Sequence, residues 1–220
     1  MTTPTIEEYL EAIYIMQSED AAVISARVAE RIGVSAPTMT DTLKRMIKQG
    51  YVVVNKQKEI TLTEKGREAA EALVRRHRLS ERWLTDVLGL DWATAHQEAC
   101  KLEHAISPAV EERLSKVLDN PSTCPHGNPI PGSGKKVDDG SVPLNRASEG
   151  DEVTVIRISQ TAEEDPRFLD YLQRNAIVPN ADLKIVEVAP WAGTVTVSSG
   201  GSNVSIGLQA AAHIWVLIKR

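Results

Sequence analysis

A stretch without periodicity divides this chain of 220 residues, and it limits what the chain can fold into. Residues 120–145 are dense in Pro, Gly, Ser and Asp, a composition typical of loops and linkers. The chain before this stretch carries apolar residues at helical spacing, whereas the chain after it consists mainly of short, strand-like runs. We therefore predict an α+β chain in which a linker over 121–148 joins a helical part to a part built of strands.

The first 62 residues follow the order helix, helix, helix, hairpin. Apolar residues of the first helix share one face, and a short second helix follows. Ser35 is placed to cap a third helix, which Gly50 is placed to end. Strand-like runs at 51–54 and 60–62 then form the hairpin. This order predicts a winged helix-turn-helix domain over 1–62, whose third helix enters the major groove of DNA.

Residues 63–120 are predicted to form a helical domain that also contacts a second copy of the chain. Ala, Leu, Glu and Arg dominate residues 63–88, which indicates one long helix. Asp91 is a plausible cap for a second helix, and Ser107 followed by Pro108 begins a third. These helices carry more apolar side chains than one helical layer can hide. The expected dimer contacts are Val74, Leu79, Trp83, Leu84, Val87 and Leu88.

Residues 149–220 are predicted to form short strands, interrupted by one helix near 166–173. Several short strands separated by turn signals favour a small barrel. The expected strands cover 152–158, 183–188, 194–198, 204–208 and 214–218.

Composition excludes some functions and leaves others open. No charged and then apolar leader opens the chain, and no apolar run approaches the roughly 20 residues of a membrane helix. We therefore expect a cytoplasmic protein that does not contact a membrane. The net charge of −5 gives no general attraction to nucleic acid, so DNA binding requires a local basic patch.

The first domain contains such a patch, which favours DNA binding over the alternative of a plain protein-interaction module. Between residues 22 and 60 stand seven Lys or Arg and three Asp or Glu residues, a local net charge of +4. Lysines at the hairpin tip are expected to contact phosphate, and the start of the third helix is expected to face base edges. The predicted DNA-contacting residues are Arg27, Ser35, Pro37, Thr38, Thr40, Asp41, Lys44, Lys56 and Lys58.

Four of the five histidines and both cysteines fall within residues 77–126, at spacings that suit metal binding. Residues three and four apart share a helix face, so His77 with Glu81, and three residues within 100–104, can each converge on one ion. The pair Cys124 and His126 lies in the linker, where metal ligation is favoured and simple turn chemistry is the alternative. The candidate ligands are His77, Glu81, His96, Cys100, Glu103, His104, Cys124 and His126.

The chemistry of these donors narrows the kind of ion. A structural zinc site usually has four Cys or His ligands and few carboxylates, which differs from this set. Carboxylates mixed with imidazole and thiol favour an exchangeable first-row ion such as Mn²⁺, Fe²⁺, Co²⁺ or Ni²⁺.

Three segments carry a resemblance to a known family: VRRHRLSER at 74–82, HQEACKLEH at 96–104 and HGNPIPG at 126–132. With them, the chain resembles the diphtheria-toxin-repressor family of iron- and manganese-dependent transcriptional regulators over its whole length. The resemblance implies a winged-helix domain, metal-binding dimerisation helices, a Pro-rich linker and a C-terminal SH3-like β-barrel over 149–220.

The resemblance also implies two metal sites per chain. The regulatory site would consist of Glu8, Cys100, Glu103 and His104. The second site would contain His77 and Glu81, completed either by His96 or by Cys124, His126 and Asp165, with Glu163 or Glu164 behind Asp165. The hard carboxylate of Glu8 beside the soft thiol of Cys100 leaves the choice between Mn²⁺ and Fe²⁺ open; Co²⁺, Ni²⁺ or Zn²⁺ would also bind in vitro.

From these observations we predict a homodimeric repressor that a divalent metal activates to bind a palindromic operator in double-stranded DNA, controlling manganese or iron homeostasis. The competing hypothesis is a metal-dependent hydrolase with Glu81 or Glu103 as general base beside an ion-bound water. No second catalytic group is placed for such work, so we predict that the protein is not an enzyme.

Overall fold

The computed structural model describes residues 3–19, 22–137 and 139–219, and it divides into two compact units. The first unit contains Met1–His77 and Glu103–Ala105, and the second contains Arg78–Leu102 and Ile106–Arg220. Helix α4 (Glu64–Arg82) contributes to both units, because the boundary falls directly after His77.

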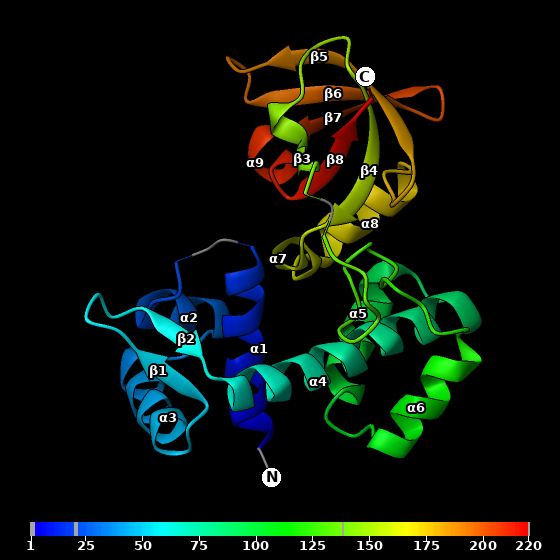
Figure 1. The fold of residues 1–220 in the computed structure, drawn as a ribbon. Coiled ribbons are helices and arrows are strands. Elements are labelled where there is room, and N and C mark those ends of the chain that lie inside the picture. The colour runs from blue at the N-terminus through cyan, green and yellow to red at the C-terminus, as the bar shows by residue number, and fades with distance from the viewer. Residues whose placement is uncertain (1–2, 20–21, 138, 220) are drawn as a thin grey trace. The chain divides into compact units, whose positions relative to one another are not determined.

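The first unit is a winged helix-turn-helix, as predicted (Figure 1). It contains α1 (Pro4–Ser18), α2 (Ser25–Ile32), α3 (Ala36–Lys48) and an antiparallel hairpin of β1 (Val52–Val54) with β2 (Ile60–Leu62). The Ser35 side chain accepts a hydrogen bond from the Thr38 N–H and so caps α3. Gly33 ends α2 with φ of 73°, a left-handed conformation that glycine adopts without strain.

One apolar core holds the first unit together. Buried side chains of α1, α2, α3, the hairpin and the start of α4 form a single cluster, with Leu10, Ile13, Met39, Met46 and Ile60 among its members. Burial of several large side chains, each contributing about 1.5–3 kcal/mol, stabilises this arrangement. Helices α1 and α3 therefore share one core.

Helix α4 begins in close contact with the end of α3 and the start of β1. The Thr63 hydroxyl donates a hydrogen bond to the Gly50 carbonyl at 2.7 Å, and the Lys65 ammonium lies 4.3 Å from the ring centroid of Tyr51. Gly66 is buried, and a Cβ at this position would lie 2.0 Å from the Tyr51 carbonyl oxygen. Only glycine permits this approach, which joins α4 to the winged helix-turn-helix.

The helical part of the second unit contains the end of α4, α5 (Trp92–Leu102) and α6 (Pro108–Val117). The helix predicted over 63–88 changes its winding after Arg82 and continues as a π-helix over Trp83–Val87. Gly89, with φ of 70°, ends it. Val87 and Leu88 are exposed here, as are Val110 and Val117 of α6.

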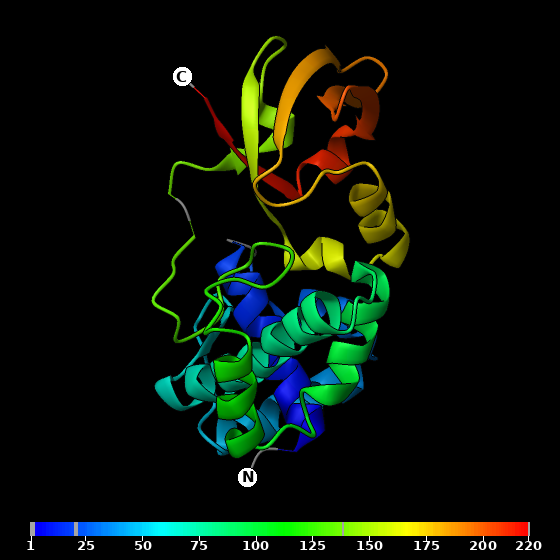
Figure 2. The ribbon, with the colours of Figure 1, turned by 90° about the vertical axis from the view of Figure 1, so that its right-hand side faces the viewer.

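A six-stranded antiparallel sheet forms the C-terminal part of the second unit, in the order β3-β8-β4-β5-β6-β7. Its strands are β3 (Val142–Pro143), β4 (Glu152–Ile158), β5 (Asp182–Ala189), β6 (Thr194–Ser199), β7 (Ser202–Gly207) and β8 (Ile214–Ile218). Between β4 and β5 lie α7 (Gln160–Glu163) and α8 (Pro166–Arg174), which leave the sheet where β4 ends (Figures 1 and 2). Helix α9 (Leu208–Ala211) precedes β8, and a 3₁₀-helix (Leu144–Arg146) follows β3.

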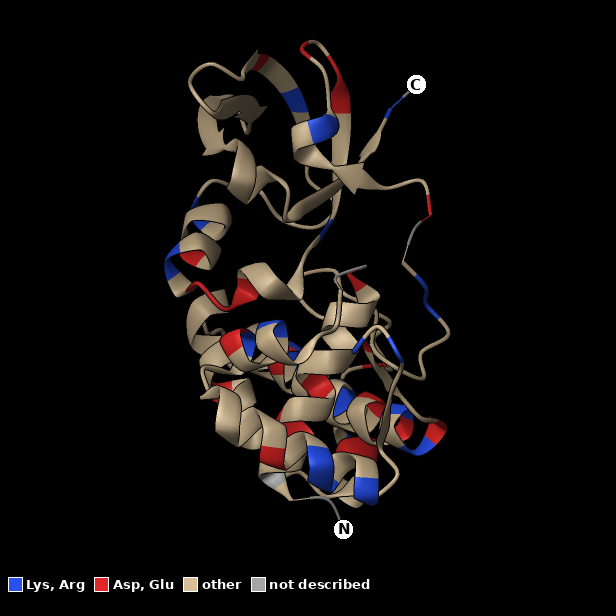
Figure 3. Ribbon diagram, turned by 90° about the vertical axis from the view of Figure 1, so that its left-hand side faces the viewer, with Lys and Arg blue, Asp and Glu red and all other residues tan. Residues whose placement is uncertain are grey.

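Alternating burial along these strands places one sheet face on a large apolar core that includes Val153, Val155, Val197 and Ile214. No charged residue occurs from 188 to 218, so β6, β7, α9 and β8 are drawn entirely in tan in Figure 3. The strands predicted over 152–158 and 214–218 are confirmed with the same bounds.

The segment predicted as a linker packs in part against this unit. Cys124, His126, Asn128 and Ile130 are buried, and residues 142–146 supply β3 and the 3₁₀-helix. None of the helices among the described residues is long and apolar enough to cross a membrane.

We predict that Gly66→Ala lowers the free energy of unfolding by about 1–3 kcal/mol, because its methyl group would overlap the Tyr51 carbonyl. Gly207→Ala is the matched control: the same methyl there would lie 4.0 Å from the nearest atom, and φ is −60°. Urea unfolding of the two variants measures the difference. Equal stability of Gly66→Ala and the unchanged protein would show that this contact adjusts freely.

Candidate metal centres

Carboxylates and imidazoles gather at one place in the first unit. The side chain of His104, in the turn after α5, stands among carboxylates of α1. Its Nδ1 lies 2.9 Å from Glu7 Oε2, and its Nε2 lies 3.4 Å from Glu8 Oε1 and 3.4 Å from Glu103 Oε1. The predicted ligands Glu8, Glu103 and His104 are thus brought together, with Glu7 beside them.

A second imidazole extends this group. His77 Nδ1 of α4 lies 2.6 Å from Glu103 Oε2, and both side chains are buried. Glu11 of α1, His77 and Glu103 each offer a ligand atom, and the three atoms lie within 4.8 Å of one another. Glu103 therefore faces His104 with one oxygen and His77 with the other, as a carboxylate that bridges two ligand sets would.

Burial and the neighbouring carboxylates have opposite effects on the pKa of His104. Burial by itself lowers that pKa, but the hydrogen bond to Glu7 and the charges of Glu103, Glu7 and Glu8 raise it above its ordinary value. The imidazole is thus held among negative charges that favour a cation at its position, whether a proton or a metal ion.

Another group of carboxylates and imidazoles lies in the second unit, where four elements converge. His96 Nδ1 of α5 lies 3.0 Å from Glu81 Oε1 of α4 and 3.8 Å from Glu163 Oε2 of α7. His126 Nδ1, in the turn after α6, lies 3.4 Å from Glu81 Oε1 and 3.2 Å from Glu163 Oε1. Two carboxylates therefore stand between two imidazoles.

Cys124 adds a thiol to this cluster. Its Sγ lies 3.9 Å from His126 Nδ1, the side chain is buried, and ligand atoms of Glu81, Cys124 and His126 lie within 4.8 Å of one another. His126 is fully buried, and its Nδ1 faces these donors. Carboxylate, thiol and imidazole donors that meet in a buried place form a set that fits a divalent metal ion.

Burial by itself lowers the pKa of His126, yet the negative charges of Glu163 and Glu81 and hydrogen bonds with Cys124 and Glu163 raise it well above its ordinary value. The ring packs edge-on against Trp92, with centroids 4.7 Å apart. Aromatic packing fixes the ring orientation while the carboxylates favour its cationic form.

The turn that carries Cys124 and His126 is docked on β4. The Ile158 N–H donates to the His126 carbonyl at 2.8 Å, and the Asn128 amide donates to the Ile158 carbonyl and to Glu163 Oε1, both at 2.7 Å. Gly127 has φ of 86°, and a Cβ there would lie 2.2 Å from the Ile156 carbonyl oxygen. Hydrogen bonds and close backbone packing therefore hold the turn against β4.

Two arginines of α4 hold the same region from the other side. The Arg82 Nε donates to the Thr123 carbonyl at 2.8 Å. Arg78 Nη2 donates to Gln160 Oε1 at 2.7 Å, and its Nη1 also donates to the Pro129 carbonyl. Since Gln160 opens α7, these bonds tie α4 to the turn and to the helix that carries Glu163.

Asp165, predicted as a ligand of the second site, makes other contacts in this structure. Asp165 caps α8, accepting a hydrogen bond from the Arg167 N–H at 3.0 Å, and its exposed carboxylate pairs with the Arg167 side chain at 3.2 Å. An acidic residue directly before Pro166 is a helix-capping signal, which explains the position. Glu163, ranked behind Asp165 on sequence, occupies the cluster with both carboxylate oxygens near imidazoles.

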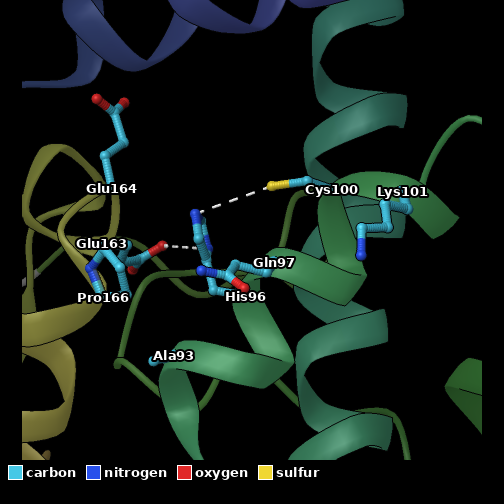
Figure 4. Close-up of a pocket in the computed structure, with 8 residues that line it drawn as sticks. All are labelled: Ala93, His96, Gln97, Cys100, Lys101, Glu163, Glu164 and Pro166. Atoms are coloured by element: carbon cyan, nitrogen blue, oxygen red, sulfur yellow. Dashed lines mark hydrogen bonds and ion pairs between the residues drawn. The ribbon is translucent and has the colours of Figure 1, made fainter.

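Cys100 belongs to the second unit and lines an open pocket of about 470 Å³ with His96, Glu163 and Glu164 (Figure 4). Its Sγ lies 3.9 Å from His96 Nε2. The His96 ring in this view stands between the thiol and Glu163, so its two nitrogens face different groups (Figure 4).

Sequence reasoning missed Glu7 and Glu11 in the first cluster. Both are on α1, where Glu7 and Glu11 are four residues apart and Glu8 and Glu11 are three apart. Residues at these spacings share a helix face, so the signal was present in the sequence.

The predicted DNA-contacting residues are exposed on the first unit. Pro37, Thr38, Thr40, Asp41 and Lys44 are exposed on α3. Lys56 and Lys58 are exposed in the turn between β1 and β2, and Arg27 is exposed on α2. Their placement suits contacts to a duplex lying against α3 and the hairpin.

Three segments of the chain match known protein families. Residues 1–60 match the family described as "Iron dependent repressor, N-terminal DNA binding domain", and residues 63–132 match "Iron dependent repressor, metal binding and dimerisation domain". Residues 142–217 match the FeoA domain, which corresponds to the predicted SH3-like part.

Individual proteins and solved structures are similar over nearly the whole chain. The iron-dependent repressor IdeR of Mycobacterium tuberculosis is 40% identical over 217 residues, 94% of each chain. The diphtheria toxin repressor of Corynebacterium diphtheriae is 37% identical over 214 residues, 92% of each chain. A manganese-dependent transcriptional repressor in complex with manganese has a TM-score of 0.87 at 37% identity, covering 97% of this chain and 100% of that one.

The raised pKa of His126 predicts how the stability of the metal-free protein depends on pH. Because the folded-state pKa is raised, the protonated ring stabilises the fold fully below the unfolded value of about 6.5, and that contribution is lost as pH rises through the folded pKa. Urea unfolding of chelator-treated protein should thus show stability falling with pH above about 6.5, more steeply than in His126→Asn. An identical pH slope in His126→Asn would show that this ring does not carry the effect.

Proposed function

The chain belongs to the iron-dependent repressor family of metal-dependent transcriptional repressors, and on this premise we propose that Mn²⁺ or Fe²⁺ activates it, as a homodimer, to bind a palindromic DNA operator. Its relatives are repressors and not enzymes, so the hydrolase alternative has no support. Two-fold symmetry of a dimer requires operator half-sites about one helical turn apart, or a multiple of it.

The observation that carries the proposal is the carboxylate-rich cluster of the first unit. Residues of α1 contact His104, and Glu11 lies within ligand distance of His77 and Glu103. We propose that this cluster holds the regulatory ion through Glu8, Glu11, His77, Glu103 and His104. A bound divalent ion would supply the positive charge that these carboxylates need in order to stay close together.

The residues fit that role because repulsion opposes their approach without a cation. Four carboxylates, those of Glu7, Glu8, Glu11 and Glu103, surround two imidazoles. Like charges at such distances destabilise each other, so a cation stabilises the arrangement in which α1 stands against His77 and His104. Since α1 packs in one core with α3, this arrangement also fixes the recognition helix.

Regulation then follows from linkage. Suppose that the carboxylates of α1 stand against His77 and His104 in only part of the population. A bound cation then raises the fraction of molecules in this closed arrangement. DNA binding that requires the closed arrangement becomes tighter by the same coupling free energy, typically 1–3 kcal/mol, or about 5- to 150-fold.

We propose a second ion in the cluster of the second unit, held by Glu81, His96, Cys124, His126 and Glu163. The turn of 124–128 supports this, because backbone contacts place Cys124 and His126 beside Glu81 and Glu163. His96 and the Cys-x-His pair therefore contribute together, whereas sequence reasoning had posed them as alternatives. Cys100 was also predicted as a ligand of the regulatory site, and His77 as a ligand of this second site. Both assignments stay predictions from sequence spacing and resemblance.

The two donor sets differ in softness, which bears on the choice of metal. The first cluster offers carboxylate oxygen and imidazole nitrogen, a set that suits Mn²⁺ and Fe²⁺. The second adds the thiol of Cys124, which favours Fe²⁺, Co²⁺ or Zn²⁺ relative to Mn²⁺. We propose that the first cluster senses the regulated ion and that the second holds its ion more firmly.

The regulatory proposal is tested by Glu11→Gln, which removes one negative charge from the first cluster. Metal-dependent operator binding should weaken by about 10-fold or more, because both the ligand and part of the coupling are lost. Glu68→Gln is the matched control, since Glu68 is exposed on α4 and the chemical change is identical. Fluorescence anisotropy with Mn²⁺ buffered at several concentrations measures the effect; equal metal dependence in the two variants would contradict the proposal.

The second site is tested by comparing Glu163→Gln with Asp165→Asn. We expect Glu163→Gln to bind one metal ion fewer per chain, because its carboxylate lies between His96 and His126. Asp165→Asn should keep the full stoichiometry, because that side chain caps α8. Equilibrium dialysis followed by elemental mass spectrometry gives the counts. If only Asp165→Asn bound one ion fewer, Asp165 and not Glu163 would be the ligand of the second site.

A further inference from the structure

The exposed ridge of the recognition helix contains one negative charge. Met39, Thr42 and Met46 of α3 are buried. On the opposite side, Pro37, Asp41, Lys44 and Lys48 follow at spacings of four, three and four residues, and all four are exposed. Any duplex that receives this helix in its major groove must meet that ridge, and Asp41 stands in its N-terminal half, where base edges are read.

The hydroxyl groups around Asp41 are already bonded within the helix. Ser35 Oγ accepts from the Thr38 N–H at 3.3 Å and lies 2.8 Å from Thr38 Oγ1. Thr40 Oγ1 donates to the Ala36 carbonyl at 2.8 Å. The hydroxyl oxygens of these residues therefore stabilise the first turns of α3 and can form fewer hydrogen bonds with bases.

The Asp41 carboxylate can still accept most of its hydrogen bonds. Its side chain is 78% exposed, and its contact is with Lys44 on the next turn, whose Nζ lies 3.5 Å from Oδ1. An ionised carboxylate only accepts hydrogen bonds, so it cannot bond phosphate oxygens and is repelled by them. In the major groove, its partners are the N–H donors on base edges, cytosine N4 and adenine N6.

Cytosine fits a carboxylate better than adenine does. The adenine edge pairs its N6 donor with the N7 acceptor, an arrangement that an amide matches with one donor and one acceptor. A carboxylate would place an oxygen against N7 without a proton between them. Cytosine offers its N4 amino group without that neighbouring acceptor on the same base.

We propose that Asp41 is a specificity-determining residue that accepts a hydrogen bond from the N4 amino group of one cytosine in each operator half-site. The proposal rests on the proposed function, since it concerns the same operator complex. Lys44, beside it, offsets the charge of the carboxylate near the phosphates and contributes to affinity without selecting a base.

The test is selection from a randomised duplex library by the full-length protein, run with Mn²⁺ and separately with Fe²⁺. It compares the unchanged chain with Asp41→Ala and Asp41→Asn. The unchanged chain should enrich one C·G pair per half-site, and replacing that pair should weaken its binding about 10- to 100-fold, the range of one good base contact. Asp41→Ala should lose the preference at that position alone. Asp41→Asn should shift it towards A·T, since an amide matches adenine.

Lys48→Met is the control on the same ridge. It should weaken binding to all sequences alike and leave the enriched sequence unchanged, as loss of a phosphate contact does. Asp41 and Lys48 are both exposed, so thermal unfolding and metal stoichiometry should match those of the unchanged chain in every variant.

Two results would overturn the inference. If Asp41→Ala enriches the same half-site as the unchanged chain, Asp41 reads no base, while metal-activated operator binding still stands. If the unchanged chain enriches no sequence with Mn²⁺ or Fe²⁺, the proposed function fails and this inference fails with it.

Discussion

Carboxylates placed beside imidazoles in buried positions are the constraint on which the structure depends. Glu81 and Glu163 have side chains that are 0% and 1% exposed, and Glu103 is 4% exposed. An ionised carboxylate is costly to bury unless a cation stands close to it, and in both clusters imidazole nitrogens lie within 3.5 Å. The same arrangement that tolerates a proton accepts a metal ion, so protons and metal ions compete for these nitrogens.

Contacts from several elements hold the second cluster in place. Gly127 allows the turn to lie on β4, Asn128 bonds both the Ile158 backbone and Glu163, and Arg78 and Arg82 bind the turn from α4. Ligands held by such contacts lose little freedom on binding, which raises affinity. The first cluster depends instead on α1, whose Glu7 is partly buried and whose Glu8 is exposed, so less packing constrains the Glu8 side chain. A firm site and an adjustable site in one chain suit the roles of holding and sensing.

Much of the fold could be predicted from the sequence, because periodicity and capping are local signals. The Ser35 cap, the turn at Gly33 and the strands over 152–158 and 214–218 follow from neighbouring residues alone. Glu163 was ranked below Asp165 because the choice depends on how α7 and α8 leave β4, which is a tertiary property. The π-helical winding after Arg82 has no signal in the sequence that we can identify.

Metal binding at α1 would act on the proposed DNA-reading residues through packing and not through their own hydrogen bonds. The cap and hydroxyl bonds of α3 lie within the helix itself, and Met39 and Met46 anchor it in the core that also contains Leu10 and Ile13 of α1. We therefore expect a change at α1 to reach α3 through this shared core and to leave the chemistry of its exposed ridge unaltered. In a dimer that binds two half-sites, as we propose, the placement of each DNA-binding domain would decide whether both helices reach their grooves together. Under these proposals, metal would control where the recognition helices stand, while residues such as Asp41 would decide which bases they read.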